Sequence, residues 1–167
     1  QVVGREPARS GDCLDERLVD LDVAREVGLA ELREARLGLT GPRTHLLTVR
    51  GRRTGKLWST PVSIVEEGGE RWLVAPYGTV DWVHNARAAG RVSLRRGRRT
   101  LERSIREVDD PPEAAPILKE YLSITGPPRR YFSAKPGDPV DQFEAEALAH
   151  PVFELLPVGQ QGDEIAG

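Results

Sequence analysis

The stretch of the chain best suited to chemistry is a cationic tip between two apolar segments. Residues 44–50 include the apolar residues Leu46, Leu47 and Val49, and Gly51-Arg52-Arg53-Thr54-Gly55-Lys56 follows them directly. Arg52 and Arg53 can each bind two oxygens of a phosphate or carboxylate, Thr54 and backbone amides can add hydrogen bonds, and Lys56 adds a point charge. Three cations, two glycines and a hydroxyl at a hairpin tip therefore predict a site for an anion, most often a phosphate group.

Familiar nucleotide-binding and hydrolase motifs do not explain this tip. Compared with a P-loop, the tip is one residue short between its glycines, Leu57 replaces the metal-binding hydroxyl residue, and a strand is expected where a helix should follow. The chain has no Gly-x-Gly-x-x-Gly after a strand and no Gly-x-Ser-x-Gly elbow. A nucleotide hydrolase, a Rossmann dehydrogenase and an α/β-hydrolase are thus disfavoured.

Metal and nucleophile chemistry have equally little support. His45, His84, His150 and the single Cys13 are far apart in the sequence and show no metal-ligand spacing. We interpret each histidine as a structural or surface residue. A strong anion site combined with few candidate acids, bases or nucleophiles favours a protein whose bound cofactor carries the reaction.

The elements that must position this tip follow from hydrophobic patterning and turn residues. Helices are expected at residues 14–37, 80–89, 111–123 and 141–149, strands at 44–50, 57–66, 71–76, 91–95, 100–108 and 150–156, and a loop at 126–140. Six short strands, mostly linked as hairpins, predict an α+β fold built on an antiparallel barrel with flanking helices. A doubly wound sheet would need strands that alternate with helices.

Composition predicts one soluble domain. The chain has 167 residues, 38% of them apolar and 30% charged, with a net charge of -2. We expect residues 1–13 to be disordered, 14–158 to form a single barrel domain, and 159–167 to form a flexible tail. No apolar run approaches the roughly 20 residues of a membrane span, and the beginning lacks the apolar centre of a secretory signal. With its lone cysteine, the chain is expected in the cytoplasm.

A second basic cluster, Arg95-Arg96-Gly97-Arg98-Arg99, invites comparison with nucleic-acid-binding segments. It is an isolated turn with few aromatic residues nearby, so we interpret it as a solvated turn and expect no nucleic-acid partner.

Four sequence blocks together resemble a known family. They are Leu46-Leu47-Thr48 with the cationic tip, then Ser59-Thr60-Pro61-Val62, then Leu73-Val74-Ala75-Pro76-Tyr77-Gly78, and then Asp81-Trp82-Val83-His84-Asn85-Ala86-Arg87 with Ala88-Ala89-Gly90. In this order they resemble the deazaflavin (F420)-dependent nitroreductase family, which are split β-barrel flavin/deazaflavin oxidoreductases of actinobacteria. The resemblance implies a six-stranded antiparallel split barrel of the FMN-binding type.

The resemblance also implies coenzyme F420, a hydride donor with a phosphodiester and an oligoglutamate tail. Several carboxylates on that tail would explain the number of cations at the tip. The implied cofactor-binding residues are Arg52, Arg53, Thr54, Lys56, Ser59, Thr60, Pro61, Val62, Ala75, Pro76, Tyr77, Gly78, Trp82 and Asn85. The electron acceptor is expected to be a quinone, an enone or another conjugated molecule.

Several alternatives stay open at this point. Some relatives carry an Arg near Trp58 and a Lys or Ser near Pro76-Tyr77, so tail contacts are expected to be fewer, with Arg50 or Arg87 as compensating cations. FMN, with one phosphate, is therefore an alternative cofactor. Trp82 is a wall of the cofactor site, a core anchor or both, and the cationic tip could be merely solvated.

The catalytic side chains and the assembly are also left open by the sequence. Tyr121 and Tyr131 are the candidate catalytic proton donors, with Ser123 or solvent as other sources. A non-catalytic carrier of F420 or flavin is the competing function, and the protein is expected to be a monomer or a homodimer.

Overall fold

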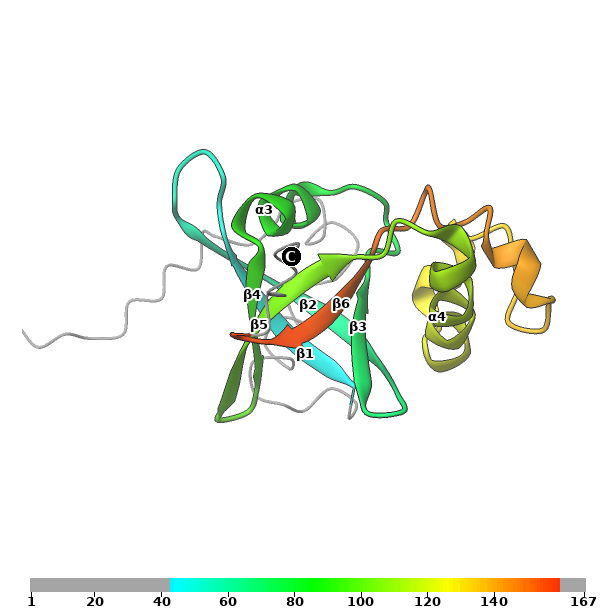
Figure 1. Cartoon of the computed structure of the whole chain (residues 1–167), viewed down its shortest axis with the longest axis horizontal. Coiled ribbons are helices and arrows are strands. Elements are labelled where there is room, and N and C mark those ends of the chain that lie inside the picture. Colours follow the sequence, from blue (N-terminus) through cyan, green and yellow to red (C-terminus); the bar gives the residue numbers. More distant parts are fainter. Residues whose placement is uncertain (1–42, 160–167) are drawn as a thin grey trace, which may run out of the picture.

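The fold is a small barrel with one helix at its end and one at its side (Figure 1). A computed structural model describes residues 43–159; the helix expected at 14–37, the segment 1–13 and the tail residues 160–167 lie outside this range. The elements, in chain order, are β1 (Thr44–Arg50), β2 (Leu57–Glu67), β3 (Glu70–Val74), α3 (Asp81–Ala89), β4 (Arg91–Arg96), β5 (Arg99–Glu107), α4 (Pro111–Ile124), the 3-10 helices η1 (Pro127–Tyr131) and η2 (Val140–Phe143), and β6 (Val152–Pro157).

The six strands close into an antiparallel barrel in the order β1-β2-β3-β6-β5-β4. This confirms the predicted fold class. Strand β1 lies between two neighbours, with Leu47 opposite Thr60 of β2 and Leu94 of β4. Because directly opposite residues share a face of the sheet, this register fixes which side chains enter the barrel and which face outward.

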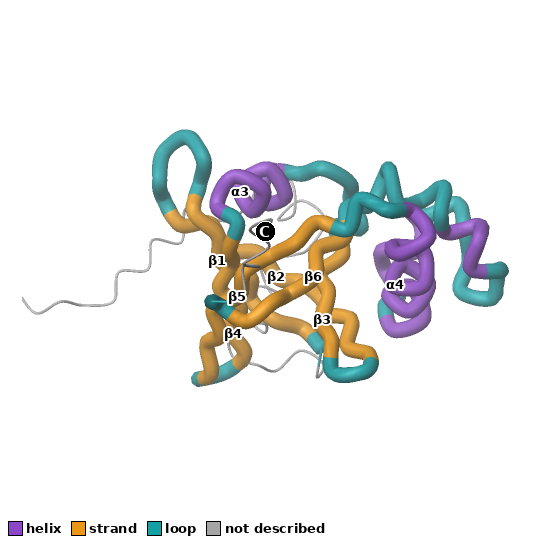
Figure 2. Tube along the Cα trace, viewed as in Figure 1, coloured by secondary structure: helices purple, strands orange, loops and turns teal. Residues whose placement is uncertain are grey.

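The barrel interior is an apolar core that α3 closes at one end. The strands supply alternating side chains, among them Leu47, Ile64 and Phe153, and the helix adds Trp82 and Val83. The β1–β2 loop and α3 lie at this same end (Figures 1 and 2). The end of the barrel next to the cationic tip is therefore a packed surface.

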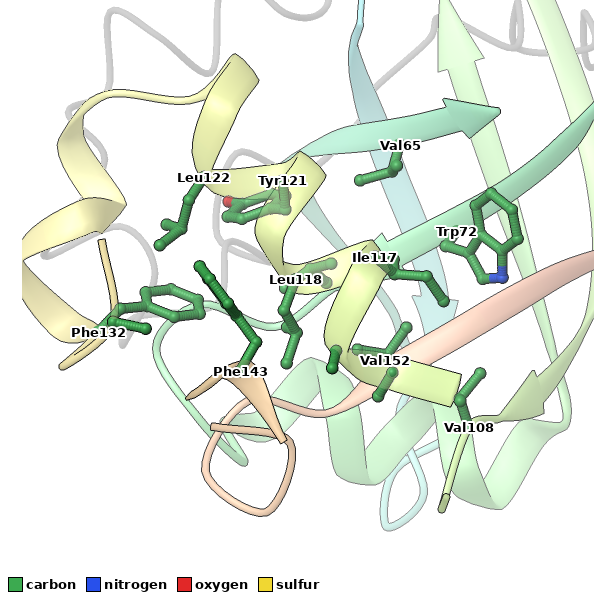
Figure 3. Close-up of a cluster of buried hydrophobic side chains, with 14 residues drawn as sticks. Val65, Trp72, Val108, Ile117, Leu118, Tyr121, Leu122, Phe132, Phe143 and Val152 are labelled. Carbon is green, nitrogen blue, oxygen red and sulfur yellow. The ribbon is translucent and has the colours of Figure 1, made fainter. Parts of the chain in front are cut away.

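A second core lies outside the barrel, beneath α4. Val65, Trp72 and Val152 project outward from three adjacent strands, and Ile117 and Leu118 of α4 cover them (Figure 3). Each fully buried side chain of this size contributes about 1.5–3 kcal/mol. This cluster holds α4 and the segment after it against the barrel.

The structure corrects three sequence-based assignments: the end of one strand, one loop and one helix. Strand β3 ends at Val74, so Ala75 and Pro76 belong to the following connection; the Ala75 amide bonds instead to the Pro151 carbonyl at 2.8 Å. The expected loop at 126–140 contains η1. The expected helix at 141–149 is wrong, because only η2 forms there.

The reason for the missing helix is visible in its hydrogen bonds. Amides of residues 142, 144, 146, 147 and 149 bond to carbonyls three positions earlier, which gives 3-10 turns. Phe143 is the fully buried apolar residue of this stretch, and Glu146 is turned inward to bind neighbouring backbone. Local bonding and one buried anchor replace the repeating apolar face that a longer helix requires.

Neither helix within residues 43–159 is long and apolar enough to cross a membrane.

Candidate functional site

The cationic tip is a closed loop with defined backbone geometry. The Gly51 amide donates to the Lys56 carbonyl at 2.7 Å, and the Gly55 amide donates to the Gly51 carbonyl at 2.9 Å. Arg50 Nη1 adds a bond to the Gly55 carbonyl at 3.0 Å. A Cβ at position 51 would lie 2.8 Å from Trp58 Nε1, so the close contact with the indole requires glycine there. Arg50, expected as a possible compensating cation, is thus engaged in closing the loop.

One of the three predicted cations fastens this loop to α3. Asn85 Oδ1 accepts hydrogen bonds from the Arg52 main-chain amide at 3.1 Å and from Arg52 Nη1 at 2.9 Å. The Arg52 guanidinium also lies 3.3 Å from Asp81 Oδ1. Since Asn85 is 5% exposed, its amide is a fixed anchor for the tip. The family resemblance implied that Arg52 and Asn85 both bind the cofactor. In the structure, these two residues are in direct contact with each other.

The other two cations remain on the surface of the loop. Arg53, Thr54 and Lys56 are exposed, and no carboxylate among residues 43–159 forms an ion pair with Arg53 or Lys56. Thr54 Oγ1 accepts a hydrogen bond from the Lys56 amide at 3.3 Å, which orders the turn that carries both cations. An anion at this tip would meet two positive charges without displacing a described acidic partner.

Strand β2 presents its predicted contact residues to opposite faces. Thr60 and Val62 point into the barrel, whereas Ser59 and Pro61 face outward. Ser59 Oγ lies 2.9 Å from Thr48 Oγ1 on the outer face. A flat molecule on the outer surface can therefore reach the side chain of Ser59 but only the backbone of Thr60.

The connection from β3 to α3 forms a close-packed ledge. Ala75 and Pro76 are buried, and Gly78 adopts a φ of +81°, which favours glycine. The Gly78 amide bonds to the Ala75 carbonyl at 3.2 Å, and a Cβ on Gly78 would lie 3.3 Å from the Ala149 carbonyl. This ledge runs across the same barrel end toward α3 and the cationic tip (Figure 2).

The structure places Trp82 in the barrel core. Its side chain is 3% exposed, and its ring centroid lies 6.0 Å from that of Phe153. Of the two interpretations that the sequence left open, its packing matches the core anchor.

Arg87 does not lie free to compensate for missing tail contacts. Its guanidinium makes two hydrogen bonds to Glu107, at 2.8 Å from Nε and 2.6 Å from Nη2. The Glu107 bond raises the pKa of Arg87, and burial partly opposes that rise.

An aromatic wall stands beside the ledge. The rings of Tyr77 and Tyr131 meet edge to face with centroids 5.0 Å apart. Tyr131 is 37% exposed, its hydroxyl accepts a hydrogen bond from Arg130 Nη2 at 2.9 Å, and the Arg130 guanidinium also lies over its ring. Tyr131 therefore combines an accessible ring with a hydroxyl that is oriented by a cation.

The second candidate proton donor, Tyr121, is enclosed. It is 3% exposed in the cluster under α4, near Phe132 (Figure 3). Burial raises the pKa of its hydroxyl above the ordinary value of 10.0, Tyr77 raises it further, and a hydrogen bond with Thr125 opposes both. Tyr121 thus keeps its proton at neutral pH, and Tyr131 is the tyrosine of the pair that a bound molecule can touch.

A buried histidine and carboxylate behind this wall escaped the sequence analysis. His150 Nε2 lies 3.3 Å from Glu146 Oε2, and the two residues are 5% and 7% exposed. The sequence signal was their spacing of four residues, but the segment was read as an ordinary short helix. The sequence analysis interpreted His150 as a structural or surface residue, and the structure shows that it is buried. Nothing in the sequence indicated that His150 lies between the ledge and the aromatic wall.

Comparison with protein families gives a match over more than half of the chain. Residues 26–122 match the family described as F420H(2)-dependent quinone reductase. A comparison with curated proteins gives no match.

Solved structures support the same fold. The chain is 27% identical to an F420-H2 dependent reductase (FDR-A), with a TM-score of 0.50 over 68% of this chain and 94% of that one. A protein described as a domain-swapped dimer is 23% identical, with a TM-score of 0.50 and coverages of 81% and 98%. A protein of unknown function from Agrobacterium tumefaciens is 18% identical, with a TM-score of 0.51 and coverages of 78% and 55%. The last two comparisons concern the fold alone.

Proposed function

The chain belongs to the F420H(2)-dependent quinone reductase family, and on this basis we propose which residues hold reduced coenzyme F420 and which face its acceptor. The cofactor is F420, and the reaction is a two-electron reduction in which F420H2 and a quinone become F420 and a hydroquinone. The observation that carries the assignment of the site is the cationic tip: Arg53 and Lys56 are exposed on a loop that Arg52 fastens to α3.

The residues present fit the anionic part of this cofactor. Arg53 can bind two oxygens of a phosphate or carboxylate, and Lys56 can bind a further one. Arg52 holds the loop in place, and its guanidinium edge is shared with Asp81 and Asn85. Two exposed cations with no described acidic partner favour a ligand that carries more than one negative group.

The ledge and strand β2 supply neutral contacts of the kind that a flat heterocycle requires. Ser59 offers a hydroxyl, and Tyr77 and Gly78 of the ledge are partly exposed at the same barrel end. When bound, reduced F420 supplies the hydride; the protein holds the donor and acceptor together and excludes water.

Tyr131 is our candidate for the group that meets the acceptor oxygen. Its ring is partly exposed, and Arg130 donates to its hydroxyl oxygen, which stabilises negative charge there. In this proposal the hydroxyl donates its proton to a quinone oxygen that gains negative charge on reduction. Tyr121 packs behind this wall and supports it.

The finer assignments are part of the same proposal. Residues 14–158 act as one catalytic domain, and this domain prefers quinones to nitro compounds as acceptors. The protein works in the cytoplasm as a monomer or homodimer. Light scattering of the whole chain, with and without F420, measures the oligomeric state.

Titration of the protein with oxidised F420 and, separately, with FMN tests the cofactor site. We expect F420 to bind more tightly than FMN because its tail adds carboxylates for Arg53 and Lys56. Tighter binding of FMN would overturn the proposed site.

Turnover separates an enzyme from a carrier. The protein is mixed with reduced F420 and a panel of quinones, enones and nitroaromatics, and the return of oxidised F420 is followed by absorbance. We expect turnover with at least one quinone. Stoichiometric binding of reduced F420 without reoxidation by any acceptor would favour the carrier.

A further inference from the structure

A buried acidic side chain holds the segment directly after Tyr131. Glu146 Oε1 accepts hydrogen bonds from the amides of Ser133 at 2.7 Å and Ala134 at 2.8 Å. These bonds satisfy one carboxylate oxygen, and the other faces His150 Nε2. A buried carboxylate is costly unless it is paired and hydrogen-bonded. Both hydrogen bonds to Oε1 come from this one stretch of backbone, so burial of Glu146 also fixes residues 133–134.

The histidine of the pair touches the same stretch and the ledge. The His150 ring stacks on Phe132 with centroids 3.7 Å apart and planes 18° apart. The next residue, Pro151, accepts the hydrogen bond from the Ala75 amide. His150 therefore lies between the ledge that starts at Ala75 and the segment that carries Tyr131.

The surroundings of the His150 ring favour its neutral form. Burial lowers the pKa of His150, and the Glu146 carboxylate and the backbone of Ala75, Tyr131 and Pro76 oppose that change. A neutral imidazole can donate its single proton from Nε2 to Glu146, which leaves Nδ1 as an acceptor. Nδ1 is buried and has no hydrogen-bond partner within the described part of the chain.

We propose that Glu146 and His150 are positioning residues that set the distance between the acceptor-facing Tyr131 and the ledge at Tyr77. This rests on the proposed function. The pair acts through the backbone: Glu146 fixes residues 133–134, His150 supports Phe132, and Tyr131 is thereby held edge to face against Tyr77. The orientation of Tyr131 toward a quinone depends on this pair of residues, whereas the cationic tip does not.

Comparison of Glu146→Ala with Glu146→Gln in the whole protein tests this positioning role. Glutamine keeps an oxygen that can accept both amide protons, and alanine removes it. With menadione as acceptor and reduced F420 as donor, we expect Glu146→Ala to raise KM for menadione at least fivefold, with the Kd of F420 within twofold of the wild type. Glu146→Gln should keep KM within twofold, and Glu144→Ala, which removes an exposed carboxylate of the same segment, serves as the matched control.

The outcomes separate this inference from the proposed function. Absence of wild-type turnover with menadione and with every other quinone of the panel would refute the function itself. Turnover by the wild type together with an unchanged menadione KM in Glu146→Ala, or equal weakening of menadione and F420, would overturn the positioning role alone. If Glu146→Ala does not fold, Glu146→Asp replaces it: the side chain is one methylene shorter and cannot reach both amides, so the same selective rise in KM is expected, and its absence is again decisive.

Discussion

Asn85 on α3 accepts two hydrogen bonds from Arg52, one from its main-chain amide at 3.1 Å and one from its guanidinium at 2.9 Å. One buried amide oxygen thus holds both the backbone and the side chain of the loop residue that precedes Arg53. The helix is itself fastened in the barrel core by Trp82 and Val83. The cationic tip is therefore connected to a helix that is packed into the barrel core, which lowers the entropy cost of ordering the tip around a ligand.

The Asn85→Ala substitution should loosen the tip. It leaves the Arg52 amide and guanidinium without their shared acceptor, so we expect a loss of about 1–2 kcal/mol in the free energy of unfolding and a rise of about fivefold in the Kd of F420. Urea unfolding and fluorescence titration measure these effects. His84→Ala, at an exposed position of the same helix, should change neither quantity, and an unaltered Kd in Asn85→Ala would show that the anchor is irrelevant to binding.

The Arg53→Ala substitution should weaken F420 binding without unfolding the protein. The loss of a charge-assisted hydrogen bond costs about 1.5–3 kcal/mol, which corresponds to a Kd about ten to a hundred times higher. Because one charge pair is removed, the dependence of Kd on salt should also become shallower.

Arg98→Ala is the matched control for Arg53→Ala. It removes the same charge from the exposed β4–β5 turn, which lies at the opposite end of the barrel from the β1–β2 loop (Figure 1). Equal effects of the two substitutions would point to net charge alone and would exclude Arg53 from direct contact.

The Thr60→Val substitution tests whether β2 contacts the cofactor through its backbone. The Thr60 hydroxyl is 2% exposed and has no hydrogen-bond partner within residues 43–159. Replacing it by a methyl group removes an unsatisfied polar group, so we expect a gain of about 1 kcal/mol and a melting temperature about 3–5 °C higher. The Kd of F420 should stay within twofold, and clear weakening would show that the hydroxyl itself is a ligand.

Stability should fall as the pH drops through the ordinary range of histidine. Burial lowers the pKa of both His150 and His45 below the usual 6.5; Glu146 opposes the shift at His150, and at His45 the Arg43 backbone and Glu66 oppose it while Arg96 and Arg71 add to it. Below pH 6.5 the unfolded chain therefore binds protons that the folded chain resists, and the free energy of unfolding decreases with falling pH. Above pH 7 the titration of His150 and His45 should no longer change the free energy of unfolding.

Urea unfolding between pH 5 and pH 8 measures this effect. The His150→Phe variant keeps a ring against Phe132 but cannot be protonated, so its stability should depend less steeply on pH below 6.5 than that of the wild type. A slope identical to the wild type would assign the effect to other groups.

Much of the fold was predictable because its signals are local. The Gly51–Gly55 turn, the Gly68-Gly69 turn and the Gly97 turn mark three hairpins, and the strand boundaries at 44–50 and 57–66 were confirmed to within one residue. The helix at residues 141–149 was wrong because its apolar residues are anchored by one contact at Phe143, and its polar Glu146 is bonded to a distant segment. Such long-range bonds have no signature in the local pattern.

The sequence by itself determined the chemistry available to this protein: a cationic turn, strands of barrel length and a set of blocks typical of F420-binding proteins. Residue types, turn glycines and alternation are local properties, and they can be read without coordinates. Only the tertiary structure decided the roles within that set, since it placed Arg52 on Asn85, sent Trp82 and Tyr121 into the interior, left Tyr131 accessible and paired His150 with Glu146. Burial and partner choice depend on which distant segments meet when the barrel closes, and no single stretch of the chain contains that information.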